Sequence, residues 1–184
     1  MKLSIFLAVT FFTPTLFANN LQLIESTDNG FAFYRSGQPN EKDMKEFCRL
    51  GITEIMVLSG NAQDHEVKHQ AACPTLKVIY NEKQDEDIPV TGQFLDEFDS
   101  WIQDAKAHGK KVAIRCNCGC HRTGRLAAYY QMKYQNITAV DAWILLDKHG
   151  KFMVFFKNLK PQTYALQDYI KGRPCSVEEK WCVR

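Results

Sequence analysis

A cysteine and an arginine that share one short loop carry the most chemical information in this sequence. Cys116 and Arg122 are separated by five residues, and Thr123 follows directly. The apolar run 112–114 predicts a buried strand that leads into this loop, and a helix is expected to begin near its end. The first amides of a helix have no intrahelical partner and carry the positive end of its dipole. We therefore expect the loop from Cys116 to Thr123, here named the cradle loop, to bind an anion such as phosphate.

The side chains of the cradle loop predict covalent chemistry on a bound phosphate. A cysteine at a helix N-terminus beside an arginine has its thiolate favoured, so we expect a lowered pKa for Cys116 and a nucleophilic role for its sulfur. The Arg122 guanidinium can hold two phosphate oxygens at once. The Thr123 hydroxyl can donate to the thiolate and make Cys116 a better leaving group in a second half-reaction. Gly119 permits a close approach of backbone that a side chain would obstruct.

The pattern Cys-x5-Arg-Thr-Gly after an apolar strand resembles the signature of the protein tyrosine phosphatase superfamily. From about Phe31 the chain resembles the compact dual-specificity branch, and residues 34–39, Tyr-Arg-Ser-Gly-Gln-Pro, are similar to a motif of its bacterial and atypical members. The resemblance implies displacement at phosphorus by Cys116 to give a cysteinyl-phosphate, which is then hydrolysed, with no metal and no cofactor. It also implies that the substrate phosphate is bound by Asn117, Cys118, Gly119, Cys120, His121 and Gly124.

The same resemblance implies a general acid on an acidic loop before the helix that starts near Thr91. We name residues 81–89 the acidic loop. Asp85 stands four residues before Pro89, the offset at which several dual-specificity enzymes carry the acid, so Asp85 is our prediction. Asp87 is the alternative, and ordinary solvated acidity stays open for both residues.

Three residues depart from the family pattern. Arg115 stands where a histidine is usual, and alternation along the strand is expected to point it away from Cys116. Cys118 and Cys120 stand where relatives that act on polyphosphorylated inositols often have lysine, which predicts a weaker grip on highly charged substrates. These two thiols can also protect Cys116 as a disulfide, with simple space filling as the alternative. Extra positive charge at the rim can come from His121, Lys157 and Lys160.

The main functional prediction is a cysteine-dependent phosphomonoester hydrolase of the protein tyrosine or dual-specificity kind. Its partner is then a phosphorylated substrate, either a phosphoprotein or an inositol phosphate, and a phytate-type inositol polyphosphate phosphatase is the first alternative. A phosphate-binding pseudophosphatase is an alternative of another class, against which the intact Cys116, Arg122 and Thr123 count. A sulfurtransferase also presents a reactive cysteine, but its loop is typically shorter and lacks the Arg-Thr-Gly helix start.

Composition favours one globular domain. The chain has 184 residues, of which 45% are hydrophobic and 24% charged. Its 23 basic and 21 acidic residues give a formal net charge of +2 and are spread along the sequence. No basic tail or stripe indicates a nucleic-acid partner, and we expect a monomer.

The first residues predict export. Met1-Lys2, the apolar run 3–12 and the small and polar residues around Ala18 match a secretory signal peptide that is cleaved after about Ala18. The apolar run is short for a membrane span, so no stable membrane anchor is expected. We therefore expect a leader at residues 1–18, a dual-specificity-like phosphatase domain at 19–184, and a periplasmic or secreted protein.

The cysteines outside the cradle loop are candidates for disulfides in an exported protein. Cys175 and Cys182 can close a small loop near the end of the chain. Cys48 and Cys73 end successive predicted helices and can meet across them. Spacing alone does not fix connectivity, so buried free thiols remain open as an alternative.

Strands and helices alternate along the chain. Apolar runs predict strands at 31–35, 52–58, 76–80 and 111–115. Helical periodicity, caps and breakers predict helices at 40–50, 62–73, 91–108, 122–135, 138–148 and 162–171. His65 and His69 lie one turn apart in the second of these helices, but without a third ligand a solvated face is the preferred interpretation. The alternation predicts a three-layer α/β/α fold with a mainly parallel central sheet.

Overall fold

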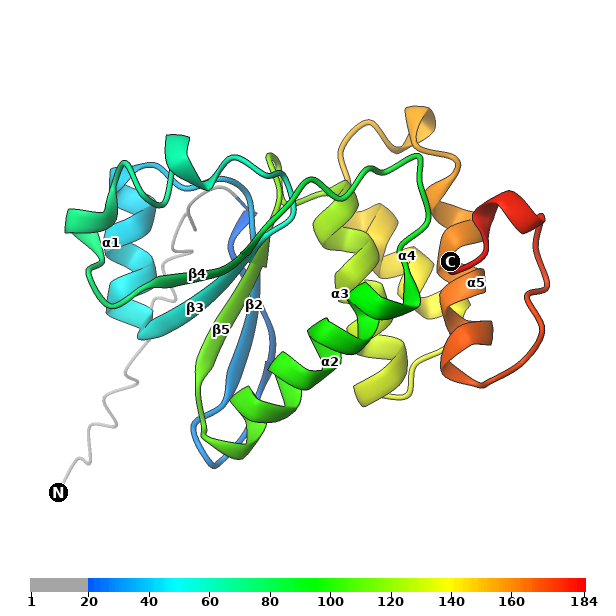
Figure 1. The fold of residues 1–184 in the computed structure, drawn as a ribbon, viewed down its shortest axis with the longest axis horizontal. Coiled ribbons are helices and arrows are strands. Elements are labelled where there is room, and N and C mark those ends of the chain that lie inside the picture. The colour runs from blue at the N-terminus through cyan, green and yellow to red at the C-terminus, as the bar shows by residue number, and fades with distance from the viewer. Residues whose placement is uncertain (1–19) are drawn as a thin grey trace, which may run out of the picture.

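A central sheet organises residues 20–184, the part of the chain that the computed structural model describes (Figure 1). The leader predicted at residues 1–18 lies outside the described residues. The strands run in the order β1-β2-β5-β3-β4, and all neighbours are parallel except β1, which pairs antiparallel with β2. β5 therefore lies in the middle of the sheet, and the cradle loop follows its carboxyl end. The strands are β1 (Gln22–Ser26), β2 (Ala32–Ser36), β3 (Ile52–Val57), β4 (Lys77–Asn81) and β5 (Lys111–Arg115).

Helices cover both faces of the sheet, which confirms the predicted three-layer fold. Figure 1 shows α1 on one side of the sheet and the other labelled helices on the opposite side. Side chains alternate along β5 accordingly: Ala113 packs in the core cluster with α1, whereas Val112 and Ile114 pack in the larger cluster with the other helices. The helices are α1 (Glu41–Leu50), α2 (Gly92–Ala107), α3 (His121–Tyr134), α4 (Ala139–His149) and α5 (Leu159–Ile170).

The helix boundaries follow local capping chemistry. The Asn40 side chain accepts from the amide of Asp43 at 3.0 Å, and the Asp43 carboxylate accepts from the amide of Asn40 at 3.1 Å, which forms a capping box at the start of α1. Gly51 ends α1 in the left-handed conformation, with φ of 76°. Thr91 and Thr138 are the N-caps of α2 and α4, where their hydroxyl oxygens accept from the amides of Phe94 and Asp141 at 3.1 Å each.

The helix predicted at 62–73 was wrong. This segment forms only short 3-10 turns at Ala62–Asp64 and Gln70–Ala72. Its polar side chains bond elsewhere: Glu66 turns inward to a buried partner, and the Gln70 amide donates to the carbonyl oxygens of Cys73 and Leu76 at 3.0 Å each. Such side-chain bonds compete with the helical hydrogen-bond ladder. β1 was not predicted, and α5 begins three residues earlier than expected.

One of the two suggested disulfides is present. Cys175 and Cys182 are bonded, with their Cα atoms 6.0 Å apart, whereas Cys48 and Cys73 are free thiols. Within residues 20–184, no helix is long and apolar enough to span a bilayer. In the same residues, no group of three or more His, Cys, Asp or Glu side chains is arranged to hold a metal ion.

Candidate active site

The cradle loop connects the end of β5 with the start of α3, as the sequence predicted. Cys116 directly follows β5 and is 3% exposed, and Arg122 and Thr123 lie in the first turn of α3. The Thr123 side chain is fully buried. Burial lowers the pKa of Arg122, but hydrogen bonding and charge from Glu86 raise it on balance, and Cys116 adds to that rise, so Cys116 and Arg122 lie within electrostatic reach of each other. The structure thus brings the three main predicted residues together in one loop.

The carbonyl oxygens of the cradle loop are bonded from outside the loop. The Arg35 guanidinium, which is 4% exposed, donates from Nη2 to the carbonyl oxygen of Gly119 at 2.6 Å and to that of Cys120 at 3.4 Å. The Gln38 amide donates to the carbonyl oxygen of Asn117 at 3.0 Å. Because C=O and N–H point in opposite directions across a trans peptide, carbonyls turned outward leave the next amides turned inward. Of these next amides, that of Cys120 donates to the sulfur of Cys118 at 3.1 Å in this structure, so an anion bound by it takes the place of that sulfur.

Gly119 is required where the cradle loop meets the end of β2. Its φ is +70°, and a Cβ at this position would lie 2.5 Å from the carbonyl carbon of Ser36 and 2.6 Å from the amide nitrogen of Gly37. Both contacts are with backbone, which cannot yield as a flexible side chain can. The Ser36-Gly37 part of the 34–39 motif therefore supports the cradle loop from behind.

The Cys116 thiol does not have the lowered pKa that the sequence predicted. A hydrogen bond with the Cys118 thiol and then burial raise the pKa of Cys116 to about 12. The hydroxyl and amide of Thr123 act in the opposite direction and lower that pKa. The Thr123 hydroxyl has no partner that meets hydrogen-bond geometry among the described residues, so its influence on the thiol is one of proximity.

The two extra thiols of the cradle loop interact with each other. The Cys120 amide donates to the sulfur of Cys118 at 3.1 Å, and the Cys120 thiol donates to the carbonyl oxygen of Cys118 at 3.3 Å. Its hydrogen bond with Cys118 lowers the pKa of Cys120. Cys116, Cys118 and Cys120 are all free thiols in this structure. The predicted redox switch among them stays a prediction.

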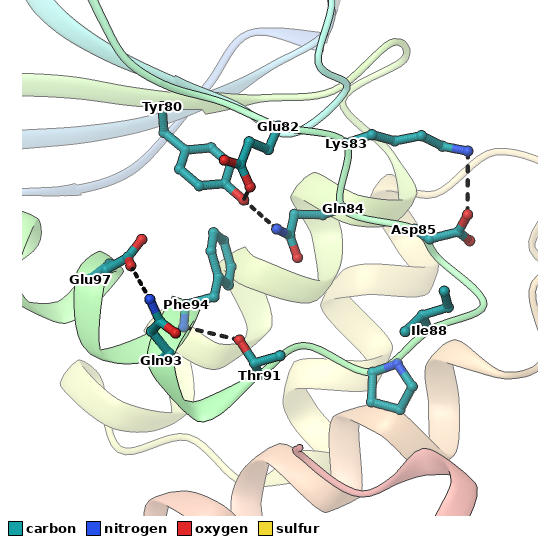
Figure 2. A pocket seen from close by; sticks show the side chains of 11 residues that line it. Tyr80, Glu82, Lys83, Gln84, Asp85, Ile88, Thr91, Gln93, Phe94 and Glu97 are labelled. Atoms are coloured by element: carbon teal, nitrogen blue, oxygen red, sulfur yellow. Dashed lines mark hydrogen bonds and ion pairs between the residues drawn. The ribbon is translucent and has the colours of Figure 1, made fainter.

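The two candidate acids point to partners outside the cradle loop. Asp85 pairs with the ammonium group of Lys83 at 3.3 Å and accepts from the amide of Asp87 at 2.9 Å, and the amide chiefly lowers the pKa of Asp85. Asp87 accepts from the side-chain amide of Asn158 at 3.1 Å. Figure 2 shows the Asp85–Lys83 pair at the edge of a cavity of about 450 Å³. That cavity lies beside the acidic loop, and no residue of the cradle loop lines it.

Glu86 is the carboxylate of the acidic loop that contacts the cradle loop, and the sequence analysis missed it. Its carboxylate accepts from Nε of Arg122 at 2.6 Å and from Nη2 at 3.5 Å. Burial raises the pKa of Glu86, but hydrogen bonding and charge from Arg122 contribute to a net lowering, so Glu86 is ionised at neutral pH. The only signal in the sequence was its place between the two aspartates.

The side chains expected to add positive charge at the rim have different roles. The His121 ring stacks on Phe156 with 3.5 Å between ring centroids, and its Nε2 lies 2.6 Å from the carbonyl oxygen of Lys151. His121 therefore holds the segment after α4 against the cradle loop. Lys157 and Lys160 are exposed.

Arg115 points away from the nucleophile, as predicted. Its fully buried guanidinium donates to the equally buried carboxylate of Glu66, with Nε at 2.6 Å from Oε1. It also donates to the Ser59 hydroxyl at 2.6 Å and to the side-chain oxygen of Asn61 at 2.7 Å. Arg115 thus joins the end of β5 to the segment that follows β3.

Comparison with known proteins decides the family. The model of the dual specificity phosphatase catalytic domain matches residues 36–168, which is more than half of the chain. The chain belongs to the dual specificity phosphatase family. The family is one of phosphatases, which are phosphoric monoester hydrolases.

Among curated proteins, this dual specificity phosphatase is similar to the RNA/RNP complex-1-interacting phosphatase homolog of Caenorhabditis elegans. The two are 31% identical over 80 residues, which is 43% of this chain and 32% of the relative. The match therefore spans about a third of the relative's length.

Solved structures share the fold. Tk-PTP in its active form superposes with a TM-score of 0.60 at 19% identity, over 81% of this chain and 97% of that chain. TpbA of P. aeruginosa in complex with pTyr gives 0.61 at 15% identity, over 86% and 99%. PTPMT1 in complex with PI(5)P gives 0.57 at 14% identity, over 83% and 97%. At these identities the likeness concerns the fold alone.

Proposed function

We propose that this phosphatase hydrolyses phosphate monoesters through a cysteinyl-phosphate on Cys116, with a phosphorylated protein side chain as its main substrate. The observation that supports this mechanism is the cradle loop itself, which holds a buried thiol at the end of β5 and a guanidinium in the first turn of α3. The Cys116 thiolate attacks phosphorus, the S–P bond forms, and the ester P–O bond breaks. Water then attacks the cysteinyl-phosphate and releases inorganic phosphate and the thiolate.

The leaving oxygen needs a proton in the first step, and we assign this role to Asp85. The assignment rests on its offset from Pro89. In the described conformation Asp85 is paired with Lys83, so its side chain must leave that partner and take up a proton before it acts. The same carboxylate then accepts a proton from the attacking water.

Replacing Asp85 tests this assignment. Asp85→Asn is expected to lower kcat by roughly 100-fold or more, and the loss should be larger for phenyl phosphate than for p-nitrophenyl phosphate, whose leaving group needs less help. Because the acid must be protonated, the fall of kcat at high pH should also disappear. Asp87→Asn is the matched control and should keep near wild-type kcat. A larger loss in the control would reassign the role to Asp87.

The choice of a simple monoester over an inositol polyphosphate rests on the charge of the cradle loop. Cys118 and Cys120 provide no cationic side chain, and Arg122 is already paired with Glu86. Polyanions bind best where several cations converge. Inositol polyphosphate hydrolysis is therefore the second candidate. A phosphate-binding module without turnover is the third.

A phosphate-release panel separates the three candidates. Purified protein is incubated with an aryl phosphate, a phosphotyrosine peptide and inositol hexakisphosphate, and Cys116→Ser serves as the blank. We expect release from the first two substrates and none from the blank. Preferential release from inositol hexakisphosphate would favour the second candidate, and equal traces in wild type and blank would leave only phosphate binding.

We also propose that the protein is exported. The sequence of residues 1–18 supports this, and so does the Cys175–Cys182 disulfide, because such bonds persist mainly in oxidising compartments. Mass spectrometry of the protein recovered from producing cells should show a chain that begins near Asn19. A full-length chain in the cytoplasm would contradict the proposal.

A further inference from the structure

The Glu86–Arg122 contact places a carboxylate on the guanidinium that is proposed to bind phosphate. The contact is bidentate, with Nε and Nη2 of Arg122 facing the two carboxylate oxygens. Both side chains are largely shielded, with 13% of Arg122 and 20% of Glu86 exposed. A carboxylate and a phosphate present the same kind of paired oxygens to a guanidinium. Glu86 therefore offers Arg122 the type of interaction that a substrate phosphate needs.

The backbone around Glu86 is anchored to two helices. Its carbonyl oxygen accepts from the side-chain amides of Asn158 at 2.5 Å and Gln162 at 2.9 Å, both from the region of α5. From α3, Arg125 donates to the carbonyl oxygens of Asp85 at 2.9 Å and Ile88 at 2.8 Å. Arg125 and Gln162 are each 2% exposed. The Glu86 side chain can turn, but its backbone is held beside Arg122.

The positive charges around the cradle loop differ in how directly they meet the Glu86 carboxylate. Arg35 is buried and committed to carbonyl oxygens of the cradle loop. The positive charge of Arg125, in α3, attracts the Glu86 carboxylate. The negative charge of Asp85, in the acidic loop, repels that carboxylate. The facing side chains from α5 are neutral amides. Lys151 also acts on Cys120 through its charge. The pairing with Glu86 therefore offsets the charge of Arg122 itself, while Arg35, Arg125 and Lys151 remain as positive charges around the cradle loop.

We propose that Glu86 is a specificity-determining residue that competes with substrate phosphate for Arg122. A phosphate monoester must displace the carboxylate from the guanidinium, and the anchored loop keeps the displaced carboxylate close to the bound phosphate. Further negative charge beside the scissile phosphate is then repelled. The site thereby prefers substrates with one isolated phosphate over polyphosphorylated ones. This proposal rests on one part of the proposed function, namely that Arg122 binds the substrate phosphate.

Binding measurements without turnover test the competition. Chains that all carry Cys116→Ser are titrated calorimetrically with inorganic phosphate, alone or combined with Glu86→Gln. Loss of the competing charge should tighten phosphate binding on the order of tenfold, in line with the strength of a charge-assisted pair. Glu82→Gln is the matched control, because it removes the same charge from an exposed residue near the acidic loop's start. It should change the dissociation constant by less than about twofold, as expected for a screened charge.

The opposite result has a clear meaning. If Glu86→Gln weakens phosphate binding or leaves it unchanged, Glu86 supports Arg122 or is idle, and the competition is refuted. Thermal unfolding of each variant shows that the comparison is between folded proteins.

The same variants test the preference between substrates. With inositol hexakisphosphate as the probe, Glu86→Gln should tighten binding by a larger factor than it does for inorganic phosphate. An equal or smaller factor would refute the role in specificity. Because neither titration requires hydrolysis, tighter binding by Glu86→Gln together with an inactive wild type would refute the proposed function and leave this inference standing.

Discussion

At the scale of single residues, the nucleophile has neighbours with opposite effects on its ionisation. The Cys118 thiol and burial raise the pKa of Cys116, whereas Thr123 lowers it. Arg122 can favour the thiolate by its charge, but in this structure that charge is shared with Glu86. With a pKa of about 12, Cys116 is a thiol at neutral pH in this conformation, and attack requires the loss of its proton.

Replacing Cys118 is expected to activate the nucleophile. Cys118→Ala removes the largest cause of the raised pKa, so the Cys116 thiol should ionise at lower pH. Alkylation of Cys116 by iodoacetamide at pH 7 should become roughly tenfold faster for each unit by which the pKa falls. The rates are followed by mass spectrometry of the peptide that contains Cys116. Cys48→Ala is the control, and a Cys118→Ala protein that reacts no faster than the control would contradict the role given to Cys118.

The sequence was sufficient for the residues that are close neighbours along the chain. Cys116, Arg122 and Thr123 lie in one loop whose geometry follows from a strand, a glycine and a helix start. Glu86 was missed because its contact with Arg122 depends on how the acidic loop is anchored by α3 and α5. The raised pKa of Cys116 was missed for a similar reason, since it depends on where the Cys118 side chain points.

At the scale of elements, the junction of β5 with α3 depends on the end of β2. Arg35 and Gln38 bond the carbonyl oxygens of the cradle loop, and the backbone at Ser36 packs against Gly119. β2 and β5 are neighbouring parallel strands, so their carboxyl ends meet at the same edge of the sheet. The spacing between these two loops is therefore set by the sheet itself.

Replacing two different glycines by alanine tests the contact between the cradle loop and the end of β2. Gly119 and Gly172 both have positive φ, at 70° and 60°, but a Cβ on Gly172 meets nothing within 4 Å. Gly172→Ala should cost about 1 kcal/mol of unfolding free energy from conformation alone. Gly119→Ala adds a clash with the Ser36 backbone, so it should lower the unfolding free energy by more than Gly172→Ala does, and it should abolish phosphate release. Urea unfolding and the aryl phosphate assay check this, and equal effects of the two variants would contradict it.

The sequence predicted the elements that carry their own local signals. The helix starts predicted at 40, 91 and 138 agree with the observed caps Asn40, Thr91 and Thr138, and the continuous apolar run 112–114 predicted β5. The segment 62–73 misled because its polar residues resembled a solvated helix. In the fold, Glu66 is instead the buried partner of Arg115, a distant interaction that no local pattern shows.

At the scale of the whole molecule, residues 171–184, here named the C-terminal segment, join the end of α5 to the start of α2. Figure 1 shows it, in red, running from α5 back towards the region where α2 begins. The Arg184 amide donates to the carbonyl oxygen of Val90 at 3.1 Å, and the Gly92 amide donates to that of Arg184 at 2.6 Å. The Cys175–Cys182 disulfide closes the segment between these points. The segment thus contacts the chain just after the acidic loop.

Removing the disulfide is expected to affect stability more than activity. The bond links cysteines seven positions apart, and closing so short a loop stabilises a fold by about 2 kcal/mol in the chain-entropy description. The double variant Cys175→Ser/Cys182→Ser should lose about that much unfolding free energy in urea titrations, whereas the control Cys48→Ser should lose less. The kcat of the double variant on an aryl phosphate should stay within about threefold of the wild-type value. The reason is that Arg125, Asn158 and Gln162 hold the acidic loop independently of the C-terminal segment. A large loss of kcat with stability intact would show that the C-terminal segment itself positions the acidic loop.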